Sequence, residues 1–216
     1  MNVLGRLECL ALLAALGPWA TAHAGPLECR TGKTEFLAGS AALPDSRYAT
    51  ATGLTVASPT RPEGWTLQRC NSSTIFFAHA DVAGKMYVTA MASDVGLPPW
   101  SDEQAFEATI LDVIAHNELP IQHMKIDAKE ASTVDGRPCL DIHRSGTIDA
   151  LQTPAGTLAG PLPSREFMRA CHLRDTRGPQ AAVLIIYKAV GVHDLADFDA
   201  ASKSFVDGAS LPTWVR

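Results

Sequence analysis

The sequence predicts an α+β fold: an antiparallel β-sheet with two helices packed on it, the arrangement of an α/β/α sandwich. Three observations support this. Short runs of alternating or β-branched residues, separated by Gly, Pro and Asn turns, fill much of the chain after residue 53. One amphipathic helix interrupts these runs, and a second follows the last of them. Because strands are grouped and helices are few, an antiparallel sheet is favoured over a parallel one.

The first 24 residues have the organisation of a signal peptide. Arg6 precedes an apolar run over residues 10–16, and Ala22-His23-Ala24 supplies small residues for cleavage. The run is shorter than the ~20 residues that span a bilayer, which disfavours a membrane anchor. We therefore expect residues 1–24 to be removed, leaving a soluble periplasmic or secreted protein with no integral membrane segment.

Four cysteines lie beyond the leader: Cys29, Cys70, Cys139 and Cys171. Exported proteins fold where thiols are oxidised, so we expect two structural disulfides among the three pairings that four cysteines allow. The chain has no C-x-x-C motif, so no zinc or redox pair is indicated. Cys139 and Cys171 fall in the middle of neighbouring predicted strands and should pair, which leaves Cys29 with Cys70.

The mature chain is divided into an N-terminal segment, residues 25–52, and one domain, residues 53–211. The first part is weakly patterned, with one short predicted strand at 34–37. In the domain, a short strand ends at Pro59 and an alternating strand covers 65–70. Residues 74–80 and 85–92 are rich in strand-forming side chains and flank Ala83-Gly84, which predicts a hairpin.

A helix is predicted over residues 101–117. Ser101 to Gln104 matches a capping box, in which the Ser101 oxygen accepts from the Gln104 amide. Phe106, Ile110, Val113 and Ile114 recur at helical spacing and predict one buried stripe.

Asp135-Gly136 lies between two extended runs, a strong signal for a two-residue hairpin. Alternation after this turn places Leu140 and Ile142 on one face of the strand and Cys139, Asp141 and His143 on the other.

Residues 165–173 and 181–189 then predict two more strands, of which the second is the most apolar and should be central. Leu195, Phe198, Ser202, Phe205 and Val206 mark the buried face of a final helix.

Residues 145–164 contain three glycines and three prolines without a clear period. We expect a long loop inserted in the domain, of the kind that is either functional or disordered. Leu151 and Leu158 are its apolar candidates for contact with a partner.

The order of these elements resembles the PsbP-like α/β/α superfamily. The resemblance is carried by residues 54–59, Gly64-Trp65, 101–114, 134–138 and 198–205, and spans about 53–211. It implies a binding or assembly module rather than an enzyme, and supplies no functional residues to carry over. The 145–164 insertion and the four cysteines depart from the pattern.

Composition and motifs exclude several functions. The net charge of −5 argues against nucleic-acid binding, which needs a basic face. The chain lacks Gly-x-Ser-x-Gly, Ser-x-x-Lys and His-Glu-x-x-His motifs, so we expect no catalytic residues, no metal and no cofactor.

The leading hypothesis is an exported, non-enzymatic accessory protein that contacts another envelope or secreted protein through residues 145–164. Its candidate binding residues are Trp100, Asp141, His143, Leu151 and Leu158. One alternative is a small-ligand or lipid carrier with a pocket lined by apolar residues: Phe76, Phe77, Met86, Met91 and Phe106. A less favoured alternative is a hydrolase built on Asp141 and His143.

Overall fold

The computed structural model describes residues 26–29, 36–42, 45–118, 121–153, 155–173, 181–191 and 195–212. The predicted signal peptide lies outside these ranges. The strands are β1 (Leu27–Glu28), β2 (Phe36–Ala41), β3 (Arg47–Ala49), β4 (Thr55–Ala57), β5 (Thr66–Cys70), β6 (Thr74–Asp81), β7 (Met86–Gly96), β8 (Gln122–Val134), β9 (Arg137–Thr153), β10 (Gly156–His172) and β11 (Ala181–Val190). The helices are α1 (Glu103–Asn117) and α2 (Leu195–Asp207).

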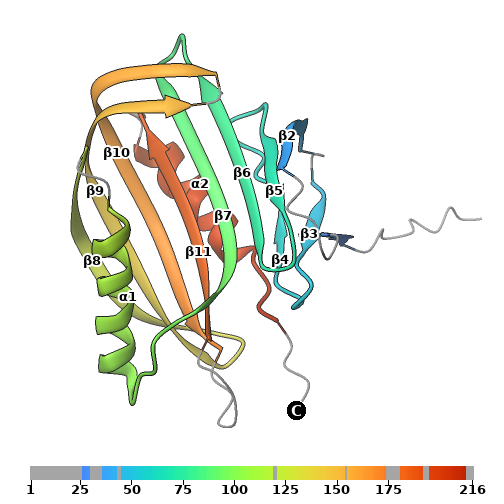
Figure 1. Cartoon of the computed structure of the whole chain (residues 1–216), viewed down its shortest axis with the longest axis vertical. Coiled ribbons are helices and arrows are strands. Elements are labelled where there is room, and N and C mark those ends of the chain that lie inside the picture. Colours follow the sequence, from blue (N-terminus) through green and yellow to red (C-terminus); the bar gives the residue numbers. More distant parts are fainter. Residues whose placement is uncertain are drawn as a thin grey trace, which may run out of the picture.

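Eight strands form one antiparallel sheet in the order β2-β5-β6-β7-β11-β10-β9-β8. Helix α1 lies on one side of this sheet and α2 on the other (Figure 1). The apolar strand β11 lies inside the sheet, between β7 and β10, as its composition predicts. The prediction of an α+β fold with two helices packed on an antiparallel sheet is confirmed.

Each face of the sheet has its own hydrophobic core. Under α1, Phe106, Ile110 and Ile114 pack with β9 and β10 residues that include Ile142 and Met168. The opposite core joins α2 to the inner residues of β6, β7 and β11 and to the small sheet β1-β3-β4. Period-2 alternation along the central strands sends successive side chains to these two cores, which explains why β10 and β11 are buried on both faces.

Residues before 53 contribute strands rather than a weakly patterned segment. β1 pairs parallel with β3, and β3 pairs antiparallel with β4. The Tyr48 ring lies 5.3 Å from the Phe77 ring, so the small sheet is packed on the large one. Cys29 and Cys70 form a disulfide that ties β1 to β5.

The second predicted disulfide, Cys139–Cys171, is also present and joins directly opposed residues of β9 and β10. Two disulfides fit a protein of a periplasmic or extracellular compartment. Neither α1 nor α2, the helices in the described part of the chain, has the length and apolar character needed to cross a bilayer.

Helix α1 begins one residue later than the capping box predicts. The Asp102 carboxylate accepts a hydrogen bond from the Ala105 amide at 2.8 Å, and the Ser101 hydroxyl donates to Asp102 at 2.8 Å. The bond from the Ala105 amide holds the pKa of Asp102 below its usual value. The prediction that Ser101 is the cap is wrong, because a carboxylate at the positive end of the helix is the better acceptor.

The prediction of a long loop at 145–164 is also wrong. β9 and β10 pair across this segment, from Ser145 opposite Arg165 to Thr153 opposite Gly156. At the turn the Thr153 hydroxyl donates to the Gly156 carbonyl at 2.7 Å, and Gly156 has a φ of +139°, which favours glycine. The segment is therefore the distal half of a long hairpin.

Two of the residues that suggested a loop, Pro161 and Gly146, have specific places in this hairpin. Pro161 lies where the register shifts between Ala159 and Leu162, so its missing N–H leaves no ladder bond unmade. Gly146 lies so close to β8 that a Cβ would collide with the backbone at His123. Here glycine permits close strand pairing instead of ending it.

Candidate functional site

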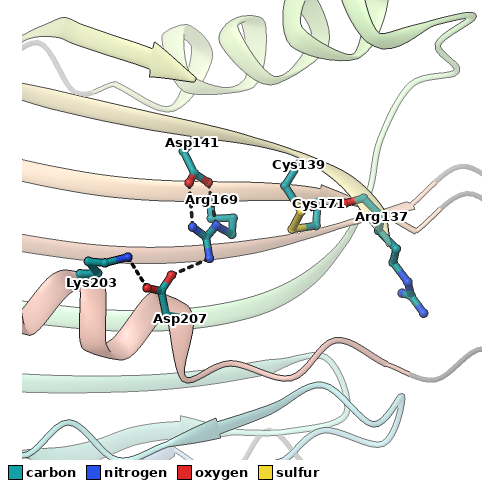
Figure 2. A network of polar contacts seen from close by, with 7 residues as sticks. All are labelled: Arg137, Cys139, Asp141, Arg169, Cys171, Lys203 and Asp207. Atoms are coloured by element: carbon teal, nitrogen blue, oxygen red, sulfur yellow. Dashed lines mark hydrogen bonds and ion pairs between the residues drawn. A yellow bond between two sulfur atoms is a disulfide. The ribbon is translucent and has the colours of Figure 1, made fainter. Parts of the chain in front are cut away.

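Asp141 and Arg169 are opposed residues of β9 and β10 on the α2 side of the sheet. The Arg169 Nε and Nη2 atoms donate to the two Asp141 carboxylate oxygens, each at 2.7 Å. The third nitrogen, Nη1, donates to Asp207 of α2 at 2.9 Å, and Lys203 also pairs with Asp207 (Figure 2). This network anchors the C-terminal end of α2 to the sheet.

The charges in this network stabilise one another. The hydrogen bond to Asp141 raises the pKa of Arg169. Burial alone would raise the pKa of Asp207, but hydrogen bonds from Lys203 and Arg169 outweigh it and hold that pKa below its usual value. With both carboxylate oxygens engaged by one guanidinium, Asp141 is arranged as a structural ion-pair partner.

His143, the other residue of the predicted polar pair, stacks on Phe167 of β10. The two rings lie 4.4 Å apart with an interplanar angle of 14°. As the alternation predicts, His143 and Asp141 share a face of β9, and His143 lies opposite Phe167. The imidazole therefore packs face to face on an apolar ring.

The other predicted binding residues are in cores. Trp100 is buried, with its ring 5.0 Å from Phe106 and 5.5 Å from His172, so it closes the core under α1. Leu158 is buried in a third, smaller core at the distal end of the β9–β10 hairpin, and half-buried Leu151 packs against it. The structure brings Asp141 and His143 onto one face but does not bring Trp100, Leu151 or Leu158 to them.

A second ion cluster lies on the α1 side of the sheet. Arg144 pairs with Glu166 at 3.1 Å and with Glu118, just after α1, at 3.0 Å. Lys188 of β11 approaches the other Glu166 oxygen at 3.5 Å. Two cations and two carboxylates balance here, so the cluster secures the end of α1 to three strands.

A groove of about 1040 Å³ lies on the α2 side of the described structure. Its floor consists of sheet residues Met86, Val88, Tyr187 and Ala189, and its walls include the α2 residues Phe198 and Phe205. The segment 57–63, which connects β4 to β5, forms the opposite side. We call this feature the α2 groove.

Tyr187 holds the two sides of the α2 groove together. Its hydroxyl donates to the Arg61 carbonyl at 3.2 Å, which fixes the 57–63 segment over β11. Its ring lies 5.8 Å from Phe198, and burial raises the pKa of its hydroxyl. The tyrosine is therefore a neutral donor with an apolar ring, suited to forming a wall.

The rim of the α2 groove is charged. The charged residues that line it are Asp45, Arg47, Arg61, Glu63, Asp81 and Asp197. An apolar floor with a few polar groups around it is the usual form of a site for a small organic ligand. Among the described residues, no cluster of three His, Cys, Asp or Glu side chains is arranged to hold a metal.

The pocket predicted from the sequence is not this groove. Of its five residues, only Met86 lines the α2 groove. Phe77 is buried in the core on the α2 side and Phe106 in the core under α1. Phe76 precedes Phe77 on the same strand and so faces the opposite way. The groove residues Phe198 and Phe205 were recognised in the sequence only as the buried face of a helix.

Comparison with known proteins gives a likeness of fold. The chain is similar to the solution structure of cyanobacterial PsbP (CyanoP) from Synechocystis sp. PCC 6803, with 12% identity and a TM-score of 0.43. The match covers 83% of this chain and 98% of that chain. No family model and no curated protein matches the sequence. The predicted resemblance to PsbP-like proteins thus has a structural counterpart in this match, which assigns no role to any residue.

Proposed function

We propose that this chain is an exported, non-enzymatic binding protein that holds a small amphipathic molecule in the α2 groove. The observation that carries the proposal is the groove itself, with a volume of about 1040 Å³ and a floor of apolar and aromatic side chains. Pockets that bind small organic ligands have volumes of roughly 300–1,000 Å³ and predominantly apolar walls. The size and chemistry of the groove therefore match a guest of that class.

Export is supported by two separate features. Residues 1–24 have the charge, apolar core and small-residue cleavage motif of a signal peptide. The two disulfides are of the kind that persists in an oxidising compartment. Together they favour cleavage of the leader and function in the periplasm or outside the cell.

The distal β9–β10 hairpin offers less support for a docking loop. Leu158, its candidate contact residue, is buried beside Ile148 and Leu162. A partner could reach it only if the hairpin opened. The α2 groove, in contrast, is a hollow with half-buried apolar residues such as Met86 and Ala201 in its lining and exposed residues at its rim, so we place the guest there.

The test is a titration of residues 25–216 with N-phenyl-1-naphthylamine, a neutral apolar dye that fluoresces when it leaves water. We expect saturable binding of one dye per chain. Ala200, exposed on α2, lines the groove, so Ala200→Trp should fill it and weaken dye binding by about tenfold or more, the equivalent of ~1.4 kcal/mol.

The matched control is Ala108→Trp, which changes an alanine that is also exposed, on α1 across the sheet. This variant should bind the dye as the unmodified chain does. Failure of the unmodified chain to bind, or equal binding by the Ala200→Trp chain with its melting temperature unchanged, would refute the groove as the site.

A further inference from the structure

We propose further that the α2 groove selects amphipathic cations, with an ammonium head among the rim carboxylates and an apolar tail on the floor. The inference rests on the proposed function and adds the charge of the guest to it. Its basis is an imbalance of charge around an apolar groove, combined with the way individual rim residues are held.

Carboxylates outnumber cations at the rim. Of the described residues that line the groove, Asp45, Glu63, Asp81 and Asp197 carry carboxylates, whereas Arg47 and Arg61 carry guanidinium groups. The described lining residues therefore carry two more negative than positive formal charges, which favours a cation over an anion at the opening.

Arg47 is committed to another contact. Its Nη2 donates to the Gly208 carbonyl at 3.3 Å and to the Ser210 hydroxyl at 3.0 Å, just beyond the end of α2. These bonds hold the guanidinium toward the C-terminal end of α2, where carbonyl groups carry partial negative charge. Although Arg47 lines the groove, these hydrogen bonds make its guanidinium group less available to pair with an anionic guest.

Asp81 is fixed in position before any guest arrives. It ends β6, and one of its carboxylate oxygens accepts from the Gly84 amide at 2.9 Å. A Cβ on Gly84 would strike the other oxygen, so the carboxylate lies tightly over the turn. Lys85, the next residue of that turn, is not one of the described residues that line the groove. A cation at Asp81 would therefore meet a preorganised acceptor.

The groove walls also suit a cation with an apolar tail. Tyr187 lies within 5.8 Å of Phe198 and 6.1 Å of Phe205, measured between ring centroids, so an aromatic group lines the interior. These rings are 2–6% exposed and pack on one another, so they offer the tail an apolar surface, while the ammonium head stays at the rim. The floor therefore suits the apolar tail, and the rim charge selects the head group.

The experiment compares three ligands with the same tail: decyltrimethylammonium, decyl sulfate and decanol, each used below its micelle-forming concentration. Each displaces N-phenyl-1-naphthylamine from residues 25–216 at low salt. We expect the cation to displace the dye at about tenfold lower concentration than the sulfate, a preference that shrinks as salt is added. Decanol should lie between them and be insensitive to salt.

Variants locate the selectivity. Asp81→Asn keeps an oxygen that can accept from the Gly84 amide, and Glu63→Gln keeps its shape, so both should fold while weakening the cation about threefold each. Decanol binding should be unchanged. Asp112→Asn, at an exposed carboxylate of α1 remote from the groove, is the control and should have no effect.

The outcomes separate this inference from the proposed function. If the dye binds but the three ligands compete equally, or the sulfate competes best, cation selectivity is wrong and the groove stands as a site. If cation preference survives both Asp81→Asn and Glu63→Gln, the rim carboxylates do not produce it. If the dye does not bind at all, both proposals fail.

Discussion

Arg169 of β10 donates two hydrogen bonds, each 2.7 Å long, to the carboxylate of Asp141 of β9. Its third guanidinium nitrogen donates to Asp207 of α2. One guanidinium thus joins two strands and a helix, on the same side of the sheet as the α2 groove. The Asp141 and Arg169 side chains are only 12% and 11% exposed, so the pair is largely shielded from water. That shielding determines what happens when one partner is removed.

Replacing Arg169 with Met should destabilise the protein severely. It leaves the Asp141 carboxylate buried without a counter-ion, and breaking a buried pair in this way costs about 3–5 kcal/mol. The double variant Arg169→Met with Asp141→Leu should recover much of that loss, because no charge remains buried. Urea denaturation measures both. A single variant within about 0.5 kcal/mol of the unmodified chain would contradict the account.

Asp207 should make the protein more stable at neutral than at acidic pH. Burial alone would raise the pKa of Asp207, but its hydrogen bonds with Lys203 and Arg169 hold this pKa below the ordinary value of 3.8. A carboxyl group whose pKa is lowered in the folded state stabilises the protein above pH 3.8, its ordinary pKa. This contribution is lost as the pH falls through the lower pKa of the folded state. In Asp207→Asn, the loss of unfolding free energy should therefore be greatest near pH 7 and shrink below 3.8. A loss that grows in acid would show the opposite sign and refute the network.

The distal hairpin should behave as a core and not as a loop. Leu158 is only 1% exposed, so Leu158→Ala should cost about 2–5 kcal/mol. Leu151, half-buried against the same cluster, should cost less when changed in the same way. Thermal melts with far-UV circular dichroism compare the two. If both substitutions were neutral, residues 145–164 would not be packed as described.

The two disulfides should leave none of the four mature cysteines free. Alkylation of unfolded, unreduced protein should label no thiol, and peptide mapping should recover Cys29 linked to Cys70 and Cys139 linked to Cys171. Changing Cys29 and Cys70 together to Ser opens a connection between residues 41 positions apart, at a cost of about 3–4 kcal/mol in the chain-entropy model. Any other linkage would contradict the placement of Cys29 beside Cys70 and of Cys139 opposite Cys171.

Local patterns predicted the elements that depend on local chemistry. Asp135-Gly136 does form a two-residue hairpin with both residues at positive φ, and Phe106, Ile110 and Ile114 are the buried stripe of α1. Alternation along β9 correctly separated Ile142 from Asp141. Each of these depends on periodicity or turn geometry, which neighbouring residues determine.

The sequence-based predictions that were wrong or missing concern features that depend on residues far apart in the chain. The sequence around Gly146 suggests that this glycine breaks a strand. In the structure it instead allows β8 to lie close to β9, and the neighbouring residues do not indicate this role. The partner of Asp141 lies 28 positions away on β10. The α2 groove combines segments near residues 45, 60, 85, 187 and 200, so its residues look like separate cores until the chain folds.

The central claim is that the α2 groove accepts an apolar guest, and NMR tests it most directly. Proton–nitrogen and methyl correlation spectra of residues 25–216 are recorded while N-phenyl-1-naphthylamine is added. We predict that the saturable shifts are concentrated at groove residues, including Met86, Val88, Ala189 and Ala201, with the α1 residues Ile110 and Ile114 unmoved. Saturable shifts centred on α1 or on the distal hairpin, or no saturable shifts at all, would contradict the account.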